Sequence, residues 1–245
     1  MKTALVTGAR KGLGFEWCRQ LGQKGYRIAL TARRKEQAKE AAEILANEGI
    51  DVLPYGVDVT SEKELQELAR QVQEDFGHLD VLINNAGINS KSRAGEDREL
   101  LLKNVALDQL AKEELLNMLD VNALSPILVG RALRPLLARS KEAKVIQIGS
   151  WLGSISIKRN GGNYSYAVSK SALNMMNRAF AFDVIEDGIV SVVVNPGWVQ
   201  TDMGGQKATF TPKESVTSVI EHVLERVGDQ DAGEFFNFDG EIHPW

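Results

Sequence analysis

The sequence predicts an α/β fold: one doubly wound parallel sheet (a Rossmann fold) with helices on both faces. Short apolar segments alternate with segments of helical periodicity, which is the pattern of consecutive βαβ units. Most of the short segments are apolar and β-branched with little alternation, as expected for strands covered on both sides. The chain of 245 residues is 43% hydrophobic and 25% charged, so we expect a single domain spanning residues 1–245.

The predicted strands are four to seven residues long, a typical length for strands in globular proteins. The first strand runs into a glycine-rich turn, and the fifth ends next to Ser150. The strands are predicted at Ala4–Thr7, Arg27–Thr31, Asp51–Val57, Val81–Asn84, Lys144–Gly149, Ile189–Asn195 and Glu234–Phe238.

The segments between the strands have helical periodicity. Thr60 and Ser61, followed by acidic residues in the first turn, indicate an N-terminal cap for the third helix. The polar segment Asn89–Arg98 lacks periodicity and is predicted to be a surface loop. The helices are predicted at Gly14–Lys24, Lys35–Glu48, Ser61–Phe76, Lys112–Arg139, Tyr164–Asp187 and Lys213–Arg226.

The net charge and the cysteine and histidine content bear on which partners and which metals the protein could bind. A net charge of −4 gives no reason to expect a nucleic acid or an anionic membrane as partner, and no apolar run is long enough to span a bilayer. Cys18 is the only cysteine, and the first strand follows Met1-Lys2 without a signal peptide, so we expect a cytoplasmic protein. The three histidines lack metal-ligand spacing, and we expect no metal site.

A glycine-rich turn, Thr7–Gly14, joins the first predicted strand to the first helix. Glycines at 8, 12 and 14 allow a tight turn and a close approach of the backbone to a ligand. The helix that follows presents free amide groups and the positive end of its dipole, which suit a pyrophosphate. The turn therefore predicts a dinucleotide site.

Tyr166 and Lys170 lie four residues apart on a predicted helix and therefore on one face, with Ser150 sixteen residues before the tyrosine. A phenol with its ordinary pKa of about 10 is a poor acid at neutral pH. A neighbouring ammonium lowers that pKa. The pair is thus predicted to exchange a proton with a carbonyl or an alcohol.

The spacing G-x-x-x-G-x-G and the motifs after it resemble the short-chain dehydrogenase/reductase family, in family order from residue 3 to about residue 203. The matching segments are Asp58-Val59, Asn84-Asn85-Ala86-Gly87, Asp120-Val121-Asn122-Ala123, Ile148-Gly149-Ser150, Tyr166 to Lys170 and Asn195 to Thr201. By this resemblance the cofactor contacts come from Gly8, Arg10, Lys11, Gly12, Leu13, Gly14, Arg33, Asp58, Val59, Asn85, Ala86, Gly87, Tyr166, Lys170, Pro196, Gly197, Val199 and Thr201.

The resemblance also implies catalytic roles. Tyr166 would donate a proton to the carbonyl oxygen, and Ser150 would hold that oxygen. Lys170 would lower the tyrosine pKa and bind the nicotinamide ribose, while Asn122 would position a water that links Lys170 to solvent. Tyr164 is a rival for the tyrosine role by spacing, but valine, not lysine, stands four residues after it.

Three segments resemble the C-factor/Sniffer-like carbonyl reductases more closely: Tyr164–Asn174, Pro196–Gly205 and the ending Asp239–Trp245. This resemblance implies a carbonyl reductase or short-chain alcohol dehydrogenase that takes a small-molecule carbonyl or alcohol. It leaves open an alternative, a C-factor-like signalling or regulatory protein that binds nicotinamide nucleotide.

The end of the second strand predicts NADP(H) rather than NAD(H). NAD sites place a carboxylate there for the ribose hydroxyls, whereas basic residues suit a 2′-phosphate. Ala32 stands at the usual aspartate position, and Arg33 follows it. Lys11, before the second glycine, supplies a second cation.

The substrate pocket and the oligomer are less sharply defined. Ser150, Trp151, Tyr164, Trp198 and Met203 flank the motifs and are predicted to line the substrate site. By family resemblance we expect a homotetramer or homodimer formed through the two long helices. Ala167, Ala172, Leu173, Met176 and Phe180 are candidate contacts, with some of them facing their own sheet.

Overall fold

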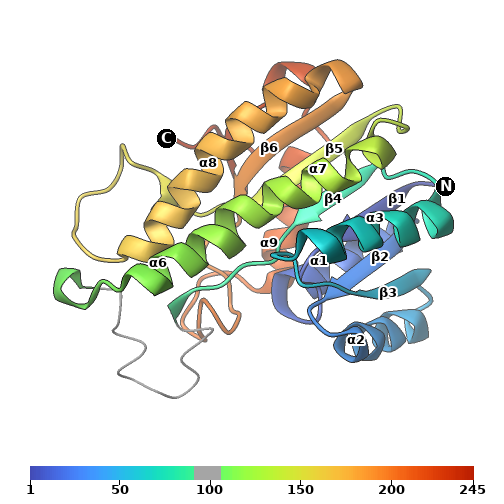
Figure 1. Ribbon diagram of the computed structural model, residues 1–245, viewed down its shortest axis with the longest axis horizontal. Coiled ribbons are helices and arrows are strands. Elements are labelled where there is room, and N and C mark those ends of the chain that lie inside the picture. The colour runs from blue at the N-terminus through green and yellow to red at the C-terminus, as the bar shows by residue number, and fades with distance from the viewer. Residues whose placement is uncertain (91–105) are drawn as a thin grey trace.

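A seven-stranded parallel sheet forms the centre of the computed structural model, which describes residues 1–90 and 106–245 (Figure 1). The strand order is β3-β2-β1-β4-β5-β6-β7, so the direction of winding reverses between β1 and β4. The predicted fold class is confirmed. The strands are β1 (Thr3–Val6), β2 (Arg27–Ala32), β3 (Val52–Gly56), β4 (Val81–Asn84), β5 (Ala143–Ile148), β6 (Ile189–Asn195) and β7 (Phe235–Asn237).

Helices cover both faces of the sheet. One apolar core lies between the sheet and α1 (Gly12–Gln23), α2 (Lys35–Asn47) and α9 (Pro212–Val219). The other lies under α3 (Glu62–Phe76), α7 (Ser125–Leu137) and α8 (Tyr164–Val184). Successive strand side chains divide between the two cores, because neighbours in a strand point to opposite faces. In β1, Ala4 and Val6 join the first core and Leu5 joins the second.

Ser61 is the N-cap of α3, since its hydroxyl accepts a hydrogen bond from the Glu64 amide at 3.3 Å. The helix α1 begins two residues earlier than expected, at Gly12, and β7 is shorter than the predicted Glu234–Phe238. Of the loop predicted at Asn89–Arg98, residues 91–98 lie outside the described part of the chain. Within the described ranges, no helix is long and apolar enough to cross a membrane.

The long helix predicted at Lys112–Arg139 is interrupted. It consists of α6 (Lys112–Leu119), a π-helical turn at Asp120–Leu124 (η2) and α7. In the turn, the Ser125 amide donates to the carbonyl of Asp120, five residues back. Pro126 has no amide hydrogen, so it has none to offer the Asn122 carbonyl four residues before it. The π turn accommodates this break and sets Asn122 at a local widening of the helix.

Candidate active site

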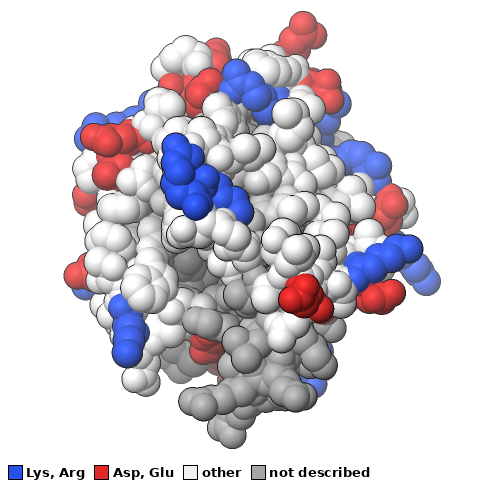
Figure 2. Space-filling model, turned by 90° about the vertical axis from the view of Figure 1, so that its left-hand side faces the viewer, with Lys and Arg blue, Asp and Glu red and all other residues white. Residues whose placement is uncertain are grey.

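The candidate site lies at the carboxyl edge of the sheet, beside the point where strand order reverses. Figure 2 faces this end of the molecule, which shows a hollow with a group of basic side chains above it. The loops after β1, β4, β5 and β6 carry most of the residues that the sequence singled out.

The glycine turn packs tightly against the loop that follows β4. Gly8 has φ +63°, and a Cβ added there would lie 2.9 Å from the Cα of Ala86. A Cβ at Gly14 would lie 2.4 Å from the amide nitrogen of Asn85. No larger residue fits either position without displacing its neighbour. Two of the predicted cofactor segments therefore meet in the structure.

Hydrogen bonds fix these two loops to each other. The Thr7 hydroxyl accepts from the backbone amides of Asn85 and Ala86, both at 3.0 Å. The side-chain amide of Asn85 donates to the carbonyls of Thr7 at 2.9 Å and Gly8 at 3.1 Å. Sequence reasoning did not assign Thr7 a role, although its place directly before Gly8 was the available signal.

The residues fit a dinucleotide at this edge. Gly12 also has positive φ, +63°, and a Cβ there would lie 3.3 Å from a methyl carbon of Thr201, so the turn also adjoins the loop after β6. The N-cap residue of α1, Lys11, makes no side-chain capping hydrogen bond. The first amides of a twelve-residue helix thus lack a side-chain acceptor and suit an anionic group.

Of the two cations expected at a 2′-phosphate, Arg33 and Lys11, the second is already paired with a carboxylate. Arg33 is exposed, and within the described residues it has no ion pair. Lys11 is not free: its ammonium forms an ion pair with Asp202, from the loop after β6. The reason is that this loop reaches back over the glycine turn at Thr201, which brings the Asp202 carboxylate within reach of Lys11.

The remaining predicted cofactor residues border the same edge. Asp58 accepts hydrogen bonds from the amide and hydroxyl of Thr60, at 3.0 and 2.8 Å. Burial of Asp120 and, to a smaller extent, the negative charge of Asp58 raise the pKa of Asp120. Leu13 and Val59 are partly buried against the two apolar cores, and Arg10 is exposed. In the loop after β6, Pro196 and Val199 are buried and Gly197 has φ +80°.

Asn122 is buried and its side chain is fully engaged. The amide oxygen accepts from the Ile88 backbone amide at 2.8 Å, and the amide nitrogen donates to the Ile88 carbonyl at 2.8 Å and the Ser169 hydroxyl at 3.0 Å. The side chain therefore clamps the loop after β4 to α8. Pro126, four residues after Asn122, has no amide hydrogen to donate to the Asn122 carbonyl.

Ser150, Tyr166 and Lys170 come together at the end of β5 and the start of α8. The Ser150 hydroxyl is near enough to the Tyr166 phenol to lower its pKa by hydrogen bonding. The ammonium of Lys170 lies 5.9 Å from the centre of the tyrosine ring and donates to the Ile148 carbonyl at 2.7 Å. Gly87 adjoins this group, since a Cβ there would lie 3.2 Å from Asn122 and 4.0 Å from Lys170.

Burial is the largest influence on the pKa values of Tyr166 and Lys170. Burial raises the pKa of the Tyr166 phenol, and the hydrogen bond with Ser150 opposes that rise. Burial lowers the pKa of Lys170 to about 8. The Lys170 ammonium donates to a backbone carbonyl, and burial is the largest influence on the pKa of the phenol.

The predicted substrate residues surround this centre unevenly. Trp151 and Trp198 are 48% and 49% exposed, and Tyr164 and Met203 are half-buried. The Trp198 indole donates to the Gly204 carbonyl at 3.0 Å, which closes a turn around Met203. Trp151, Trp198 and Met203 thus stand on the loops after β5 and β6, at the carboxyl edge of the sheet.

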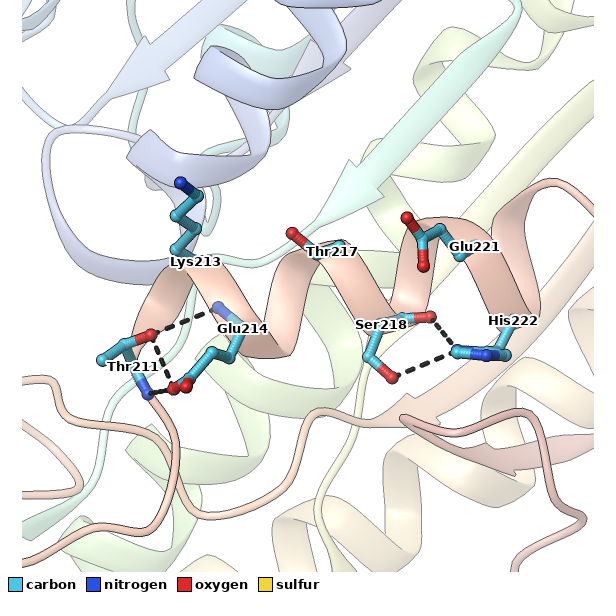
Figure 3. A pocket seen from close by; sticks show the side chains of 7 residues that line it. All are labelled: Thr211, Lys213, Glu214, Thr217, Ser218, Glu221 and His222. Carbon is cyan, nitrogen blue, oxygen red and sulfur yellow. Dashed lines mark hydrogen bonds between the residues drawn. The ribbon is translucent and has the colours of Figure 1, made fainter.

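A separate open groove runs along the outside of α9 (Figure 3). Its polar side chains satisfy one another locally: Thr211 and Glu214 form a capping box, and Ser218 hydrogen-bonds His222. It contains none of the residues predicted for the site. The groove is lined by Thr211, Lys213, Glu214, Thr217, Ser218, Glu221 and His222. Within the described ranges there is no group of three metal-ligating side chains.

Comparison with protein families gives one match over most of the chain. Residues 2–212 match the model described as "short chain dehydrogenase". The C-signal protein of Myxococcus xanthus is 35% identical over 169 residues, which cover 69% of this chain and 94% of that protein.

Solved structures resemble the whole chain. The NADPH-bound carbonyl reductase from chicken fatty liver superimposes with a TM-score of 0.87 at 28% identity, covering 100% of this chain and 99% of the other. The carbonyl reductase Sniffer of D. melanogaster gives a TM-score of 0.88 at 29% identity and covers both chains completely. The resemblance to Sniffer-like proteins predicted from the sequence is confirmed.

Proposed function

The chain belongs to the short chain dehydrogenase family and is an oxidoreductase, and on that basis we propose that it is an NADP(H)-dependent carbonyl reductase. It would interconvert a small-molecule carbonyl compound and its alcohol, with Tyr166 as general acid and base. The observation that carries this proposal is the grouping of Ser150, Tyr166 and Lys170 beside the glycine turn. We include all of residues 1–245 in one NADP-binding domain, because the sheet takes strands from β1 to β7.

NADP(H), when bound, supplies or accepts the hydride at the carbonyl carbon. The Ser150 hydroxyl and the Tyr166 phenol are close enough to interact, so a carbonyl oxygen bound between them would accept from both. Tyr166 donates its proton to that oxygen as negative charge develops there. Lys170 stabilises the phenolate that remains, because its ammonium lies on the same helix face, 5.9 Å from the ring centre.

The phenol must then regain a proton. The Asn122 side chain is committed to Ile88 and Ser169, so we assign the water-binding role to its backbone carbonyl. Pro126 cannot donate to this carbonyl, whose lone pairs would accept from a water that links Lys170 to solvent. Asn122 thus acts both as a clamp and as the start of a proton route.

The nicotinamide cofactor is NADP(H), as in the NADPH-bound chicken enzyme. Arg33 is exposed at the end of β2 beside Ala32, where no carboxylate opposes a 2′-phosphate. Lys11 would join it after exchanging Asp202 for the phosphate. The glycine cradle and the first turn of α1 would hold the pyrophosphate.

The signalling alternative is less well supported. The C-signal match covers 69% of this chain, whereas the carbonyl reductase structures cover all of it. A nucleotide-binding regulator has no need for Asn122, Ser150, Tyr166 and Lys170 together, yet the structure brings them into one group.

The proposal is tested by following NADPH oxidation with a panel of ketones, aldehydes and diketones. We expect oxidation that depends on the added carbonyl, with apolar carbonyls favoured because the exposed indoles of Trp151 and Trp198 stand on the loops after β5 and β6. A protein that binds NADPH but oxidises it with none of the panel would favour the regulatory alternative.

The lowered pKa of Lys170 predicts a pH dependence. The ammonium is needed to stabilise the phenolate, and below its pKa of about 8 it is protonated. We therefore expect kcat/KM for NADPH, which reports the cofactor-free enzyme, to fall as pH rises through about 8. Lys170→Arg, which stays protonated, should lose this decline while turning over more slowly. A profile in the unmodified protein that stays level to pH 10 would contradict this role.

We also propose a homo-oligomer that forms through α8. Ala167, Leu173 and Phe180, three of the expected contacts, are buried in the chain's own core. The large exposed apolar side chains on this helix are Val168, Met175 and Phe182, each seven residues from the next and therefore on one face.

Sedimentation at micromolar concentration should therefore show a species larger than the 27.0 kDa chain. Met175→Glu combined with Phe182→Glu should return the protein to the monomer. Met175 is 71% and Phe182 57% exposed, and each glutamate would place a charge in the proposed apolar interface. The unmodified protein sedimenting only as a monomer would rule this interface out.

A further inference from the structure

The ending Asp239–Trp245, which the sequence singled out, folds back on β7. After Asn237 the chain reverses at Gly240, which has φ +85°, and Phe236 pairs in antiparallel fashion with Ile242. The His243 amide donates to the Phe235 carbonyl at 2.7 Å. We call residues 237–245 the C-terminal hairpin. In Figure 1 the chain end lies next to α8 and the loop that precedes it.

The hairpin contacts the loop between Ser150 and α8 at Trp245. The Trp245 carbonyl accepts a hydrogen bond from the Ser156 amide at 2.7 Å. Its indole is held by two neighbours, the Phe235 ring at 5.6 Å and the Arg178 guanidinium at 5.4 Å. Ring–ring and cation–π contacts are both attractive. The indole therefore fixes the position of the Trp245 backbone oxygen, which accepts from the Ser156 amide.

A second connection reaches the same loop from the base of the hairpin. The Asn237 amide nitrogen donates to the Asp239 carboxylate at 3.1 Å, and its oxygen accepts from Asn195 at 2.8 Å. The Asn195 oxygen in turn accepts from the Trp151 amide at 3.1 Å. Because a carboxylate can only accept, Asp239 holds the Asn237 amide with its nitrogen toward Asp239 and its oxygen toward Asn195. The Asn195 nitrogen therefore faces Asn237, and the Asn195 oxygen is left to accept from the Trp151 amide.

The two connections hold the loop on both sides of its first turn, at Trp151 and at Ser156. Trp151 directly follows Ser150, the residue that holds the substrate oxygen in the proposed mechanism. Phe235, under the indole, also packs near this point, since a Cβ at Gly149 would lie 3.4 Å from its ring.

We propose that the C-terminal hairpin positions the loop that carries Ser150 and Trp151, with Asp239, Asn237 and Trp245 as positioning residues for substrate binding. This inference rests on the proposed function, because it assigns the loop to the substrate site. In these two connections the hairpin's hydrogen bonds go to Ser156 and Asn195, and the Asn195 oxygen also accepts from the amide of Gly197, a predicted cofactor residue, at 3.3 Å. Since the hairpin reaches Gly197 through Asn195, at the end of β6, its loss should affect the carbonyl substrate more than NADPH.

The experiment compares Trp245→Ala and Asp239→Ala with the unmodified protein. KM for a carbonyl substrate should rise about tenfold in each, with kcat and the Kd for NADPH changed less than about twofold. Amide hydrogen exchange, measured without substrate, should speed up in residues 151–163 and stay unchanged in the sheet. Trp245→Phe, which keeps a ring, should restore most of the protection.

Ile242→Ala is the matched control, because that side chain is 57% exposed in the same hairpin and takes part in neither connection. Unchanged exchange in residues 151–163 in both test variants would overturn the proposal. Faster exchange spread evenly over the sheet would also overturn it, because the hairpin would then be a general stabiliser. Absence of carbonyl reduction in the unmodified protein would instead count against the proposed function, which the exchange measurement does not require.

Discussion

Replacing Tyr166 by phenylalanine is expected to lower kcat for carbonyl reduction by about 10²–10⁴-fold. The substitution removes only the hydroxyl, which is the proposed proton donor and the partner of Ser150. The ring remains between α8 and the loop after β5, so the fold and the cofactor site should survive. The Kd for NADPH, measured by fluorescence titration, should stay within about twofold of the unmodified value.

Tyr164→Phe is the matched control, since it makes the same chemical change two residues away. Tyr164 has no lysine four residues after it, whereas the Lys170 ammonium lies 5.9 Å from the Tyr166 ring. This variant should therefore retain most of its turnover. The reverse ranking of the two variants would transfer the acid–base role to Tyr164.

Cofactor preference is the second large effect expected. The unmodified protein should prefer NADPH over NADH by at least about tenfold in kcat/KM, since one charge-assisted hydrogen bond contributes roughly 1.5–3 kcal/mol. Ala32→Asp combined with Arg33→Leu should shift the preference toward NADH. The new carboxylate would accept from the ribose hydroxyls and repel the 2′-phosphate.

The ion pair between Lys11 and Asp202 refines this prediction. Lys11 must leave Asp202 to reach the phosphate, so Arg33 should contribute more to the preference than Lys11 does. The preference should weaken as salt rises, because both cations are exposed and are screened. Equal kcat/KM values for the two cofactors in the unmodified protein would mean that Arg33 does not reach the 2′-phosphate.

The fold could be predicted from the sequence because strands covered on both faces consist of apolar, β-branched residues. Such segments alternate with helical segments along this chain. The glycine turn was predictable for a related reason: Gly8 and Gly14 stand where the structure leaves no space for a Cβ. The grouping of Ser150 with Tyr166 followed from the motifs and their order along the chain.

Other features depend on contacts between distant segments, which spacing does not reveal. Lys11 and Asp202 are 191 residues apart, and nothing in their local sequence pairs them. The Asn122 side chain hydrogen-bonds Ile88 and Ser169, which belong to the loop after β4 and to α8, and no local pattern predicts these partners. Pro126 was a local signal for the π turn. Because the helical periodicity continues on both sides of it, the sequence predicted one uninterrupted helix instead.

The measurement that tests the central claim most directly is the transfer of label from NADPH that carries deuterium at the transferable position of the nicotinamide. Incubated with the protein and a ketone it reduces, this cofactor should yield an alcohol with one deuterium on the former carbonyl carbon, and Tyr166→Phe should yield almost none. If NADPH binds but no carbonyl of the panel gives a labelled alcohol, the chain does not catalyse the proposed reaction. If Tyr166→Phe forms the labelled alcohol as fast as the unmodified protein, the phenol is not the proton donor.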